Sequence, residues 1–320
     1  MRSHDDLTLE AIEKATGEKP ESFVRDSDGD ILHLSYEERG IDLLPSDIGR
    51  LRHLQQLNLK GNGLTVIPRE VGRLGALEEL NLAHNRIEAL PVDIGKLQNL
   101  RILNLWTNRL TEIPPVIGRL AKLTDLALHQ NRLRDLPDSI WSLTALDSLQ
   151  LGQNQLTLLP EQLGNLADLT YLDISDNRLE TLPDALGSLP HLEYLRVGGN
   201  RFASLPTLLW RQTRLKGLHL AGSGLQTVPE ELSGLSELEM LHLGDNQLTT
   251  LPSWIGRLSK LRILHLDNNH LIRLPSELAD LPRLERLTIS RNPTLVHPPD
   301  RVRLKDTEGI LEFLRQDRGR

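Results

Sequence analysis

Three histidines recur at one fixed spacing in the second half of the chain. His219, His242 and His265 are 23 residues apart, and Asp245 and Asp267 closely follow the last two. Neutral imidazoles and carboxylates are common metal ligands, so the set could form a metal site. On neighbouring parallel strands, however, the first and third histidines would lie about 10 Å apart, whereas zinc ligands approach the ion to about 2.0–2.1 Å. We therefore expect no metal site and interpret the series as partner-contacting or pH-responsive.

Large side chains with polar tips occupy equivalent offsets upstream of these histidines. Tyr171 and Tyr194 are 23 residues apart, as are Asp173 and Arg196. Solvent-facing aromatic residues and arginine anchor protein interfaces, because they combine contact area with a polar handle. We expect these four residues and His219 to be the foremost contacts with a partner protein. The alternative is that they only coat a solvated face. The full candidate set is Trp106, His129, Tyr171, Asp173, Tyr194, Arg196, His219, His242, His265, Asp245 and Asp267.

Two other patterns that could carry chemistry are incomplete. The segment DSDGD from Asp26 to Asp30, with Glu37, partly follows a calcium-loop spacing, but Ile31 stands where that loop requires glycine. We interpret it as a turn. No nucleophile-elbow Gly-x-Ser-x-Gly occurs, and no carboxylate pair has an evident closed cleft that would shift its pKa. We expect no catalytic residue, no metal ion and no cofactor, and therefore a protein that is not an enzyme.

An internal repeat of 23 residues sets all of these positions. The pattern LxxLxLxxNxL, clear from Leu54 to Leu64, returns without a slip through twelve units, including a degenerate first unit around Arg39. Leu57 and Leu59 alternate with polar residues, which predicts one half-buried strand per repeat and a parallel sheet from the stacked strands. A proline recurs with the same step. It fixes φ where the chain leaves the strand, which favours a short helical or 3-10 turn.

The asparagine of the pattern is predicted to form a structural ladder. Its side chain offers both a donor and an acceptor, so it can satisfy backbone groups that each turn leaves without ladder partners. Leaving such a group buried and unpaired would cost roughly 1–3 kcal/mol. The ladder residues are Asn62, Asn85, Asn108, Asn131, Asn154, Asn177, Asn200, Asn246, Asn269 and Asn292, and Ser223 replaces the asparagine in one unit.

One repeat departs from the pattern more than the others. The unit that contains Trp210 and ends at Ser223 lacks both the outer leucine and the asparagine, so we expect it to be the weakest joint or an adjustment beside His219. Trp141, Trp210 and Trp254 fall on the outer segments. We interpret these three as local packing or a convex patch rather than a cofactor site.

Both ends of the chain differ from the repeat and are expected to cap its open core. A helix predicted for residues 6–17 would turn Leu9, Ile12 and Ala15 toward the first repeat, and a hairpin-like segment follows it. A second amphipathic helix, residues 306–315, would close the other end with its apolar residues, Phe313 among them. The predicted organisation is an N-terminal cap of residues 1–30, repeats over residues 31–300 and a C-terminal capping helix in residues 301–320.

The motif LPxxIGxLxxLxxLxLxxNxL, unbroken from Leu90 to Leu110, resembles the leucine-rich repeats of bacterial repeat proteins, Roco proteins and plant intracellular Ras-group-related proteins. The resemblance covers about residues 31–300. It implies an α/β repeat solenoid, a horseshoe with a parallel concave β-sheet and short helical or 3-10 convex segments, and protein recognition by the inner face. The segment from Asn292 to Leu314 resembles the one before the GTPase domain of Roco proteins, but no phosphate-binding GxxxxGK[ST] motif is present.

Composition limits the classes of partner. The 320 residues include no cysteine, which excludes disulfides and zinc-thiolate sites and suits a reducing cytoplasm. The N-terminal residues have no apolar core, and no run of about 18 apolar residues occurs. A net charge of −7 would repel nucleic acid unless the basic residues gathered into one patch.

These observations predict a bacterial, cytoplasmic and monomeric protein that binds a protein partner, with no nucleic acid and no membrane involved. Two alternatives stay open. The chain could be a recognition part, or an effector exported without a classical signal peptide, that directs an enzymatic activity on another chain or segment. It could also be a self-associating structural array.

Overall fold

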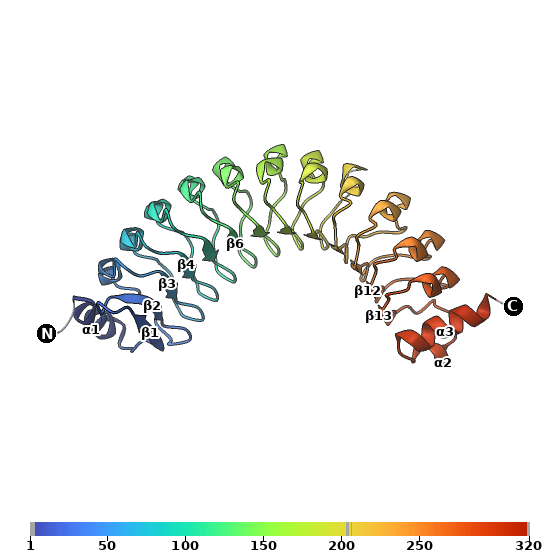
Figure 1. Ribbon diagram of the computed structural model, residues 1–320, viewed down its shortest axis with the longest axis horizontal. Coiled ribbons are helices and arrows are strands. Elements are labelled where there is room, and N and C mark those ends of the chain that lie inside the picture. Colours follow the sequence, from blue (N-terminus) through green and yellow to red (C-terminus); the bar gives the residue numbers. More distant parts are fainter. Residues whose placement is uncertain (1–3, 203–204, 206, 319–320) are drawn as a thin grey trace. The chain divides into compact units, whose positions relative to one another are not determined.

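The computed structural model describes residues 4–202, 205 and 207–318, so Pro206 of the proline column lies outside the described residues. The chain divides into two compact units, residues 1–157 with 165–169 and residues 158–164 with 170–320. Each unit repeats one architecture, in which short strands line one side and 3-10 turns the other (Figure 1). The α/β solenoid predicted from the repeat is confirmed.

The strands of the first unit follow one another across the sheet in chain order. β1 (Ser22–Arg25) is antiparallel to β2 (Ile31–Ser35), and the later pairs of this unit are parallel, with Leu57 beside Leu80 as an example. Because neighbours are 23 residues apart, equivalent side chains form columns on the sheet. The other strands of the unit are β3 (Gln56–Asn58), β4 (Glu79–Asn81), β5 (Ile102–Asn104), β6 (Asp125–Ala127) and β7 (Ser148–Gln150).

The second unit continues the pattern with parallel strands only, and its pairs keep the same register. In both units the outward side chains of the strands cover one face, here called the sheet face. The strands of the second unit are β8 (Tyr171–Asp173), β9 (Tyr194–Arg196), β10 (Gly217–His219), β11 (Met240–His242), β12 (Ile263–His265) and β13 (Arg286–Thr288).

Each 3-10 turn begins directly after a proline-column residue. Pro45 has φ −73°, and its carbonyl accepts a hydrogen bond from the Ile48 amide at 3.2 Å, which starts the turn. In the first unit the turns are Ser46–Arg50, Arg69–Arg73, Val92–Lys96, Pro115–Arg119 and Asp138–Ser142. In the second unit they are Asp184–Ser188, Thr207–Arg211, Glu230–Gly234, Ser253–Arg257 and Ser276–Asp280, and Glu161–Asn165 includes residues of both units.

The apolar core lies between the strands and the turns. Gly72, in the second turn, packs so closely on the next one that a Cβ there would lie 2.4 Å from the Asp93 carbonyl oxygen. Trp141 and Trp210 take the place of this glycine in their own repeats. Trp141, Trp210 and Trp254 are only 2%, 8% and 8% exposed, so they pack locally and do not form an outer patch.

The ladder asparagines join each repeat to the one before it. Asn85 Nδ2 donates to the carbonyls of Leu82, in its own turn, and Leu59, in the preceding repeat, at 3.0 and 2.9 Å. Its Oδ1 accepts from the Leu64 amide at 3.1 Å. Asn177 donates within its own turn to Ile174. The full set of bonds recurs at Asn62, Asn108, Asn131, Asn154, Asn200, Asn246, Asn269 and Asn292.

A left-handed residue precedes every ladder position. His84 and Gln130 have φ values of 54° and 55°, and Gly61 occupies the same place with φ 72°. A side chain in this region costs roughly 1–2 kcal/mol relative to the right-handed helical region. The ladder asparagine offsets this cost, because Asn85 also donates to the Ala83 carbonyl on the near side of His84. The asparagine therefore holds the turn as well as the stack.

Helix α1 (His4–Thr16) lies at the N-terminal end of the first unit. Leu9 and Ile12 are buried, and the Asp5 carboxylate accepts from the Ile31 amide of β2 at 2.7 Å. Ala15 is exposed, so its predicted packing is wrong. It falls in the last turn of the helix, two residues before the chain turns at Gly17, which has φ 76°.

Helices α2 (Asp300–Arg303) and α3 (Thr307–Asp317) lie at the C-terminal end of the second unit. Asp306 caps α3 by accepting from the Gly309 amide at 2.9 Å. Ile310, Leu311 and Leu314 are buried, whereas Phe313 is half-buried and packs on the His297 ring at 5.3 Å.

The irregular repeat replaces two standard contacts. In the repeat before it, Leu189 precedes Pro190, which holds Leu189 extended with ψ 118°, whereas the equivalent Leu97 has ψ 65°. The buried Gln212 stands at the outer leucine position and donates to the Leu186 carbonyl at 2.8 Å. Ser223 stands at the ladder position, and its Oγ is buried without a hydrogen-bond partner among the described residues.

Replacing a ladder residue should destabilise the first unit. Asn108→Ala removes the bonds to Leu82, Leu105 and the Ile87 amide, and we expect a loss of about 2–4 kcal/mol because these backbone groups are buried. Arg109→Ala, at the exposed neighbouring position, should change stability by less than about 0.5 kcal/mol. Urea unfolding followed by circular dichroism measures both, and equal midpoints for the two variants would contradict the role of the ladder.

Restoring the ladder should have the opposite effect. Ser223→Asn introduces the donor that the other repeats use, and we expect stability to rise by about 1 kcal/mol. Ser236→Asn, at an exposed position of the next repeat, is the matched control and should be neutral. A thermal midpoint of Ser223→Asn at or below that of the wild-type protein would show that this repeat does not miss the asparagine.

Candidate functional site

The predicted contact residues of the second unit lie on the sheet face as two columns. Tyr171, Tyr194, Gly217, Met240, Ile263 and Arg286 stand side by side at the first strand position. At the last strand position the column is Asp173, Arg196, His219, His242, His265 and Thr288. The 23-residue step thus brings residues from six separate repeats onto adjacent strands.

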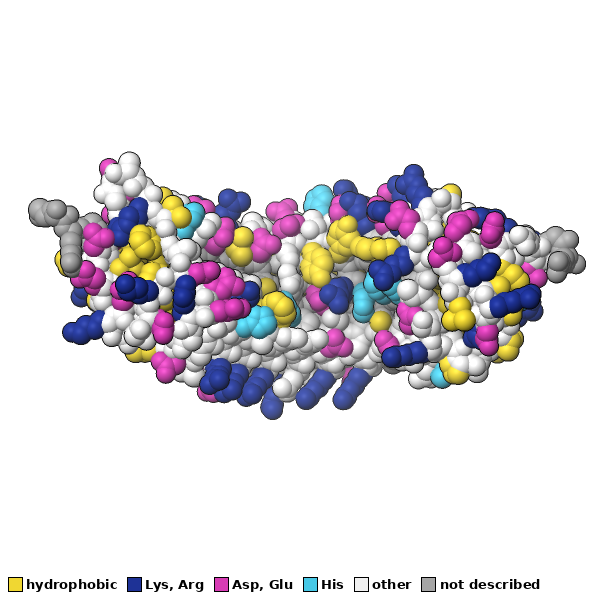
Figure 2. Space-filling view, turned by 90° about the horizontal axis from the view of Figure 1, so that it is seen from below, with side chains coloured by type: hydrophobic (Ala, Val, Ile, Leu, Met, Phe, Trp, Pro, Cys, Tyr) yellow, Lys and Arg dark blue, Asp and Glu magenta, His cyan; other side chains and the backbone are white. Residues whose placement is uncertain are grey.

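A depression of about 330 Å³ opens on this face, and we call it the Gly217 pocket. Figure 2, which looks onto the sheet face, shows histidine side chains (cyan) close to hydrophobic ones (yellow). Polar groups are few inside the depression, since tyrosine rings and a thioether form much of its wall. Its lining includes Tyr171, Tyr194, Arg196, Gly217, His219, Met240 and His242. The structure therefore brings together five of the predicted contact residues, with Gly217 and Met240 between them.

An ion pair stands at one side of the pocket. Arg196 Nη1 lies 3.5 Å from Asp173 Oδ2, and the arginine is exposed whereas the aspartate is buried. Asp173 Oδ1 accepts from both the amide and the hydroxyl of Ser175 at 2.9 and 2.5 Å. The carboxylate is thus held by its own strand end. The Arg196 side chain is 45% exposed, so a second anion can reach it from solvent.

The three histidines stack on one another. Their ring centroids are 5.0 Å apart for His219 and His242, and 4.4 Å apart for His242 and His265. Burial, and then the charges of His265, His219 and Arg196, lowers the pKa of His242 to about 4. Burial, followed by the charge of Arg196, also lowers the pKa of His219. These two rings are therefore neutral at pH 7 and present flat, uncharged surfaces.

The aspartates near the histidines accept hydrogen bonds from residues of the neighbouring repeat. Asp267 accepts from the Thr288 hydroxyl and the Ser290 amide, and its Oδ2 lies 3.8 Å from His265 Nδ1. Asp245 accepts from the Asn268 amide group at 2.6 Å. Among the residues that the structure describes, no three His, Cys, Asp or Glu side chains are arranged to hold a metal ion.

Trp106 and His129, the remaining predicted contacts, lie in the first unit. The indole stacks on His129 at 4.6 Å and meets the edge of His84 at 4.5 Å. Trp106 Nε1 donates to Gln130 Oε1 at 3.0 Å, which fixes the indole. His84 was missed because it occupies the left-handed position beside the ladder and not a strand position. The three rings form a second aromatic group.

Three arginines form a column beside the ladder of the first unit, although the net charge of the chain is negative. Arg86, Arg109 and Arg132 each follow a ladder asparagine, are exposed, and form no ion pair within the described residues. The Arg109 amide donates to the Ile87 carbonyl, directly after Arg86, so the side chains stand one repeat apart. Figure 2 shows basic side chains (dark blue) following one another along one edge of the face. The spacing of arginine after asparagine in the sequence was the signal for this column.

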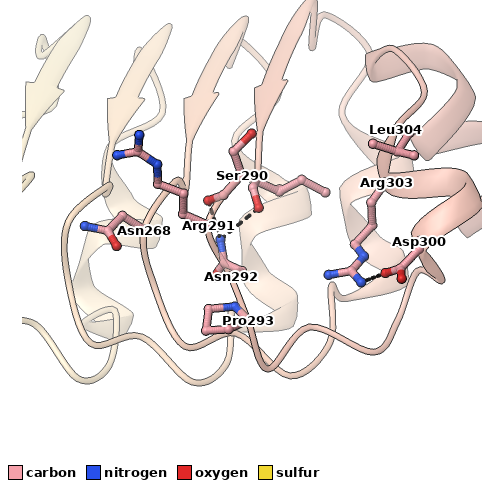
Figure 3. Close-up of a pocket in the computed structure, with 9 residues that line it drawn as sticks. Asn268, Ser290, Arg291, Asn292, Pro293, Asp300, Arg303 and Leu304 are labelled. Carbon is pink, nitrogen blue, oxygen red and sulfur yellow. Dashed lines mark hydrogen bonds and ion pairs between the residues drawn. The ribbon is translucent and has the colours of Figure 1, made fainter.

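A larger hollow, about 750 Å³, lies at the C-terminal end of the second unit between the last repeat and α2 (Figure 3). Its polar side chains serve the fold. Arg303 pairs with Asp300, and Asn292 donates to the carbonyls of Ile289 and Ser290. Leu304, on its rim, is 89% exposed. The Gly217 pocket differs because tyrosine, histidine and methionine side chains form its walls and Arg196 stands exposed beside them.

The acidic segment near the N-terminus forms a turn. Asp26 Oδ1 accepts from the amides of Asp28 and Asp30 at 2.9 and 3.0 Å, and Gly29 has φ 90°. Elsewhere in the described part of the chain, no helix combines the length and apolar character that a membrane crossing needs.

Comparison with known proteins agrees with the repeated strands and turns described above. A family profile described as "Leucine rich repeat" matches residues 40–97, 157–202 and 213–271, and one described as "Leucine-rich repeat region" matches residues 69–156. The chain belongs to the leucine-rich repeat family. Domains of this family are typically non-enzymatic interaction folds. A search of curated proteins finds no match.

Several solved structures share the fold. A leucine-rich-repeat protein of Leptospira interrogans is 31% identical, with a TM-score of 0.60, and the match covers 79% of this chain and 76% of that one. An internalin of Listeria monocytogenes is 21% identical, covers 91% and 93%, and has a TM-score of 0.65. The plant peptide hormone receptor RGFR1, solved in complex with RGF2, is 27% identical with a TM-score of 0.62, and the match covers 78% of this chain and 48% of the receptor chain.

The lowered pKa of His242 makes stability depend on pH. As pH falls below about 6.5, the unfolded chain binds a proton that the folded chain accepts only near pH 4, so stability is lost between these values. Because the ring is half-exposed, we expect about 1 kcal/mol of loss between pH 7 and pH 5 from this residue. His242→Gln should remove that part of the loss, whereas His191→Gln, at an exposed position, should not. Urea midpoints at both pH values test this, and an unchanged difference in His242→Gln would refute it.

Proposed function

We propose that the chain is a non-enzymatic interaction module that binds a partner protein through the sheet face of its second unit. The observation that carries this proposal is the Gly217 pocket, where two tyrosines, an exposed arginine and two neutral histidines surround a mainly apolar hollow. Aromatic residues and arginine supply most of the binding energy at protein interfaces when they surround a desolvated centre.

The state of these side chains supports binding over mere solvation. Tyr171 and Tyr194 are half-buried with ring centroids 6.4 Å apart, so they are already ordered and lose little entropy on binding. His219 and His242 are neutral at pH 7, which lowers the cost of covering them. A partner can therefore bury this face without removing several charges from water.

The family supports the same proposal in general terms. Leucine-rich repeats are a protein-interaction fold, and the plant receptor RGFR1 was solved in complex with RGF2. Within the proposal the protein is cytoplasmic, since a chain without cysteine suits a reducing compartment.

The proposal predicts that substitutions of the contact residues abolish binding of partner proteins, whereas substitutions on the 3-10 turns leave it intact. Tyr171→Ala/Arg196→Ala/His219→Ala should lose the proteins that the wild-type chain captures by affinity from cells of its source. The matched control is Asp184→Ala/Glu231→Ala/Arg257→Ala, at exposed residues of the 3-10 turns in the same unit. Thermal unfolding first checks that both variants fold. If the contact variant retains the wild-type set of partners, the sheet face of the second unit is not the binding surface.

A further inference from the structure

The Gly217 pocket lies where one position of a column has no side chain. The strand position of Gly217 carries Tyr194 on one neighbouring strand and Met240 on the other. A Cβ on Gly217 would lie 2.6 Å from Tyr194 Cδ1 and 3.4 Å from Met240 Cε. Both side chains therefore lean over the glycine and take part of the place of its missing side chain, and the pocket opens beside them.

The backbone does not require this glycine. Glycines with left-handed φ in this chain include Gly61 and Gly199, whereas Gly217 has the extended conformation of strand β10, which any residue adopts. The corresponding positions of the neighbouring strands hold tyrosine and methionine. The glycine is thus explained by the close approach of the Tyr194 ring, which leaves no room for a Cβ, and not by its conformational freedom.

The surroundings of this space define what fits it. Its volume of about 330 Å³ is at the lower end of the roughly 300–1,000 Å³ of pockets that hold small ligands, which suits one side chain better than a cofactor. Tyr194 and Met240 offer apolar walls, and His219 and His242 add uncharged ring surfaces. At the rim, Arg196 is exposed and its pairing with Asp173 at 3.5 Å leaves room for a second anion.

We infer that the Gly217 pocket receives one apolar side chain of the partner protein, with a carboxylate of the same segment beside Arg196. This inference rests on the proposed function, because it specifies the chemistry of the partner at the same face. It makes Gly217 and Met240 specificity-determining residues: the glycine provides the space, and the methionine adapts its flexible thioether to the incoming group.

Methionine labelling gives a direct readout. The chain has two methionines, Met1 and Met240, so methyl-¹³C-methionine gives one signal from the pocket and a second signal, from Met1, as an internal reference. The probe is N-acetyl-L-phenylalanine, which carries both an aromatic side chain and a carboxylate. We expect a saturable shift of the Met240 methyl signal and none at Met1. N-acetylglycine, which keeps the carboxylate but lacks the side chain, should leave both signals unmoved.

Two variants test the two parts of the pocket. Gly217→Ala fills the space and should abolish the Met240 shift, with circular dichroism and thermal unfolding as checks of folding. Arg196→Gln should weaken binding of N-acetyl-L-phenylalanine about tenfold, because it removes the charge-assisted bond. It should leave the weaker binding of the uncharged N-acetyl-L-phenylalanine methylamide unchanged. No saturable shift at Met240 in the wild-type chain, or an equal shift in Gly217→Ala, would overturn the inference.

Partner capture separates this inference from the proposed function. If Gly217→Ala keeps the partners that Tyr171→Ala/Arg196→Ala/His219→Ala loses, the face binds protein but the pocket does not receive a side chain. If both variants keep them, the proposed function itself fails. Loss of the same partners by both variants, together with the Met240 shift, supports the inference.

Discussion

The whole architecture depends on satisfying the backbone at one recurrent turn. After each short strand the chain reverses through a left-handed residue, such as His84, and the carbonyls there point into the core. The ladder asparagine accepts and donates at this point, and it reaches both its own turn and the preceding repeat. Since an unpaired buried carbonyl or amide would cost roughly 1–3 kcal/mol, this side chain favours one register between neighbouring repeats. The side-chain columns of the sheet face follow from that register.

Regular periodicity explains why so much of the fold could be predicted. The alternation of Leu57 and Leu59 gives the strand, the proline column gives the start of the 3-10 turn, and the 23-residue step gives parallel neighbours. The ends were less predictable, because a cap has no second copy against which to check its pattern. Ala15 has helical spacing yet is exposed, and it lies in the last turn of the helix, past the buried Leu9 and Ile12.

The irregular repeat shows a second limit of sequence patterns. Gln212 replaces the outer leucine, and its side chain donates a hydrogen bond to the Leu186 carbonyl. Leu186 belongs to the preceding repeat, between strand β8 and Pro190. Such a compensation depends on a neighbour in three dimensions, 26 residues away in the sequence, which the repeat pattern does not specify. Net charge also gives no information on where charges lie. The overall value of −7 does not indicate the exposed arginine column of Arg86, Arg109 and Arg132.

The sequence predicted only those residues of the candidate site whose type is common at protein interfaces. Tyrosine, arginine and histidine at a common offset indicate a contact surface, and the structure places Tyr171, Arg196 and His219 around one hollow. Gly217 gave no such signal, because an absent side chain is noticed only beside the filled positions on either strand. On a parallel sheet, strands lie about 4.8 Å apart, so neighbouring side chains normally cover the surface completely. Gly217 is the one position of its column without a side chain among the neighbouring strands β8 to β13, and its extended conformation does not demand glycine. The neutral histidine rings complete the argument, since a hollow walled by charged imidazoles would favour water over an apolar group.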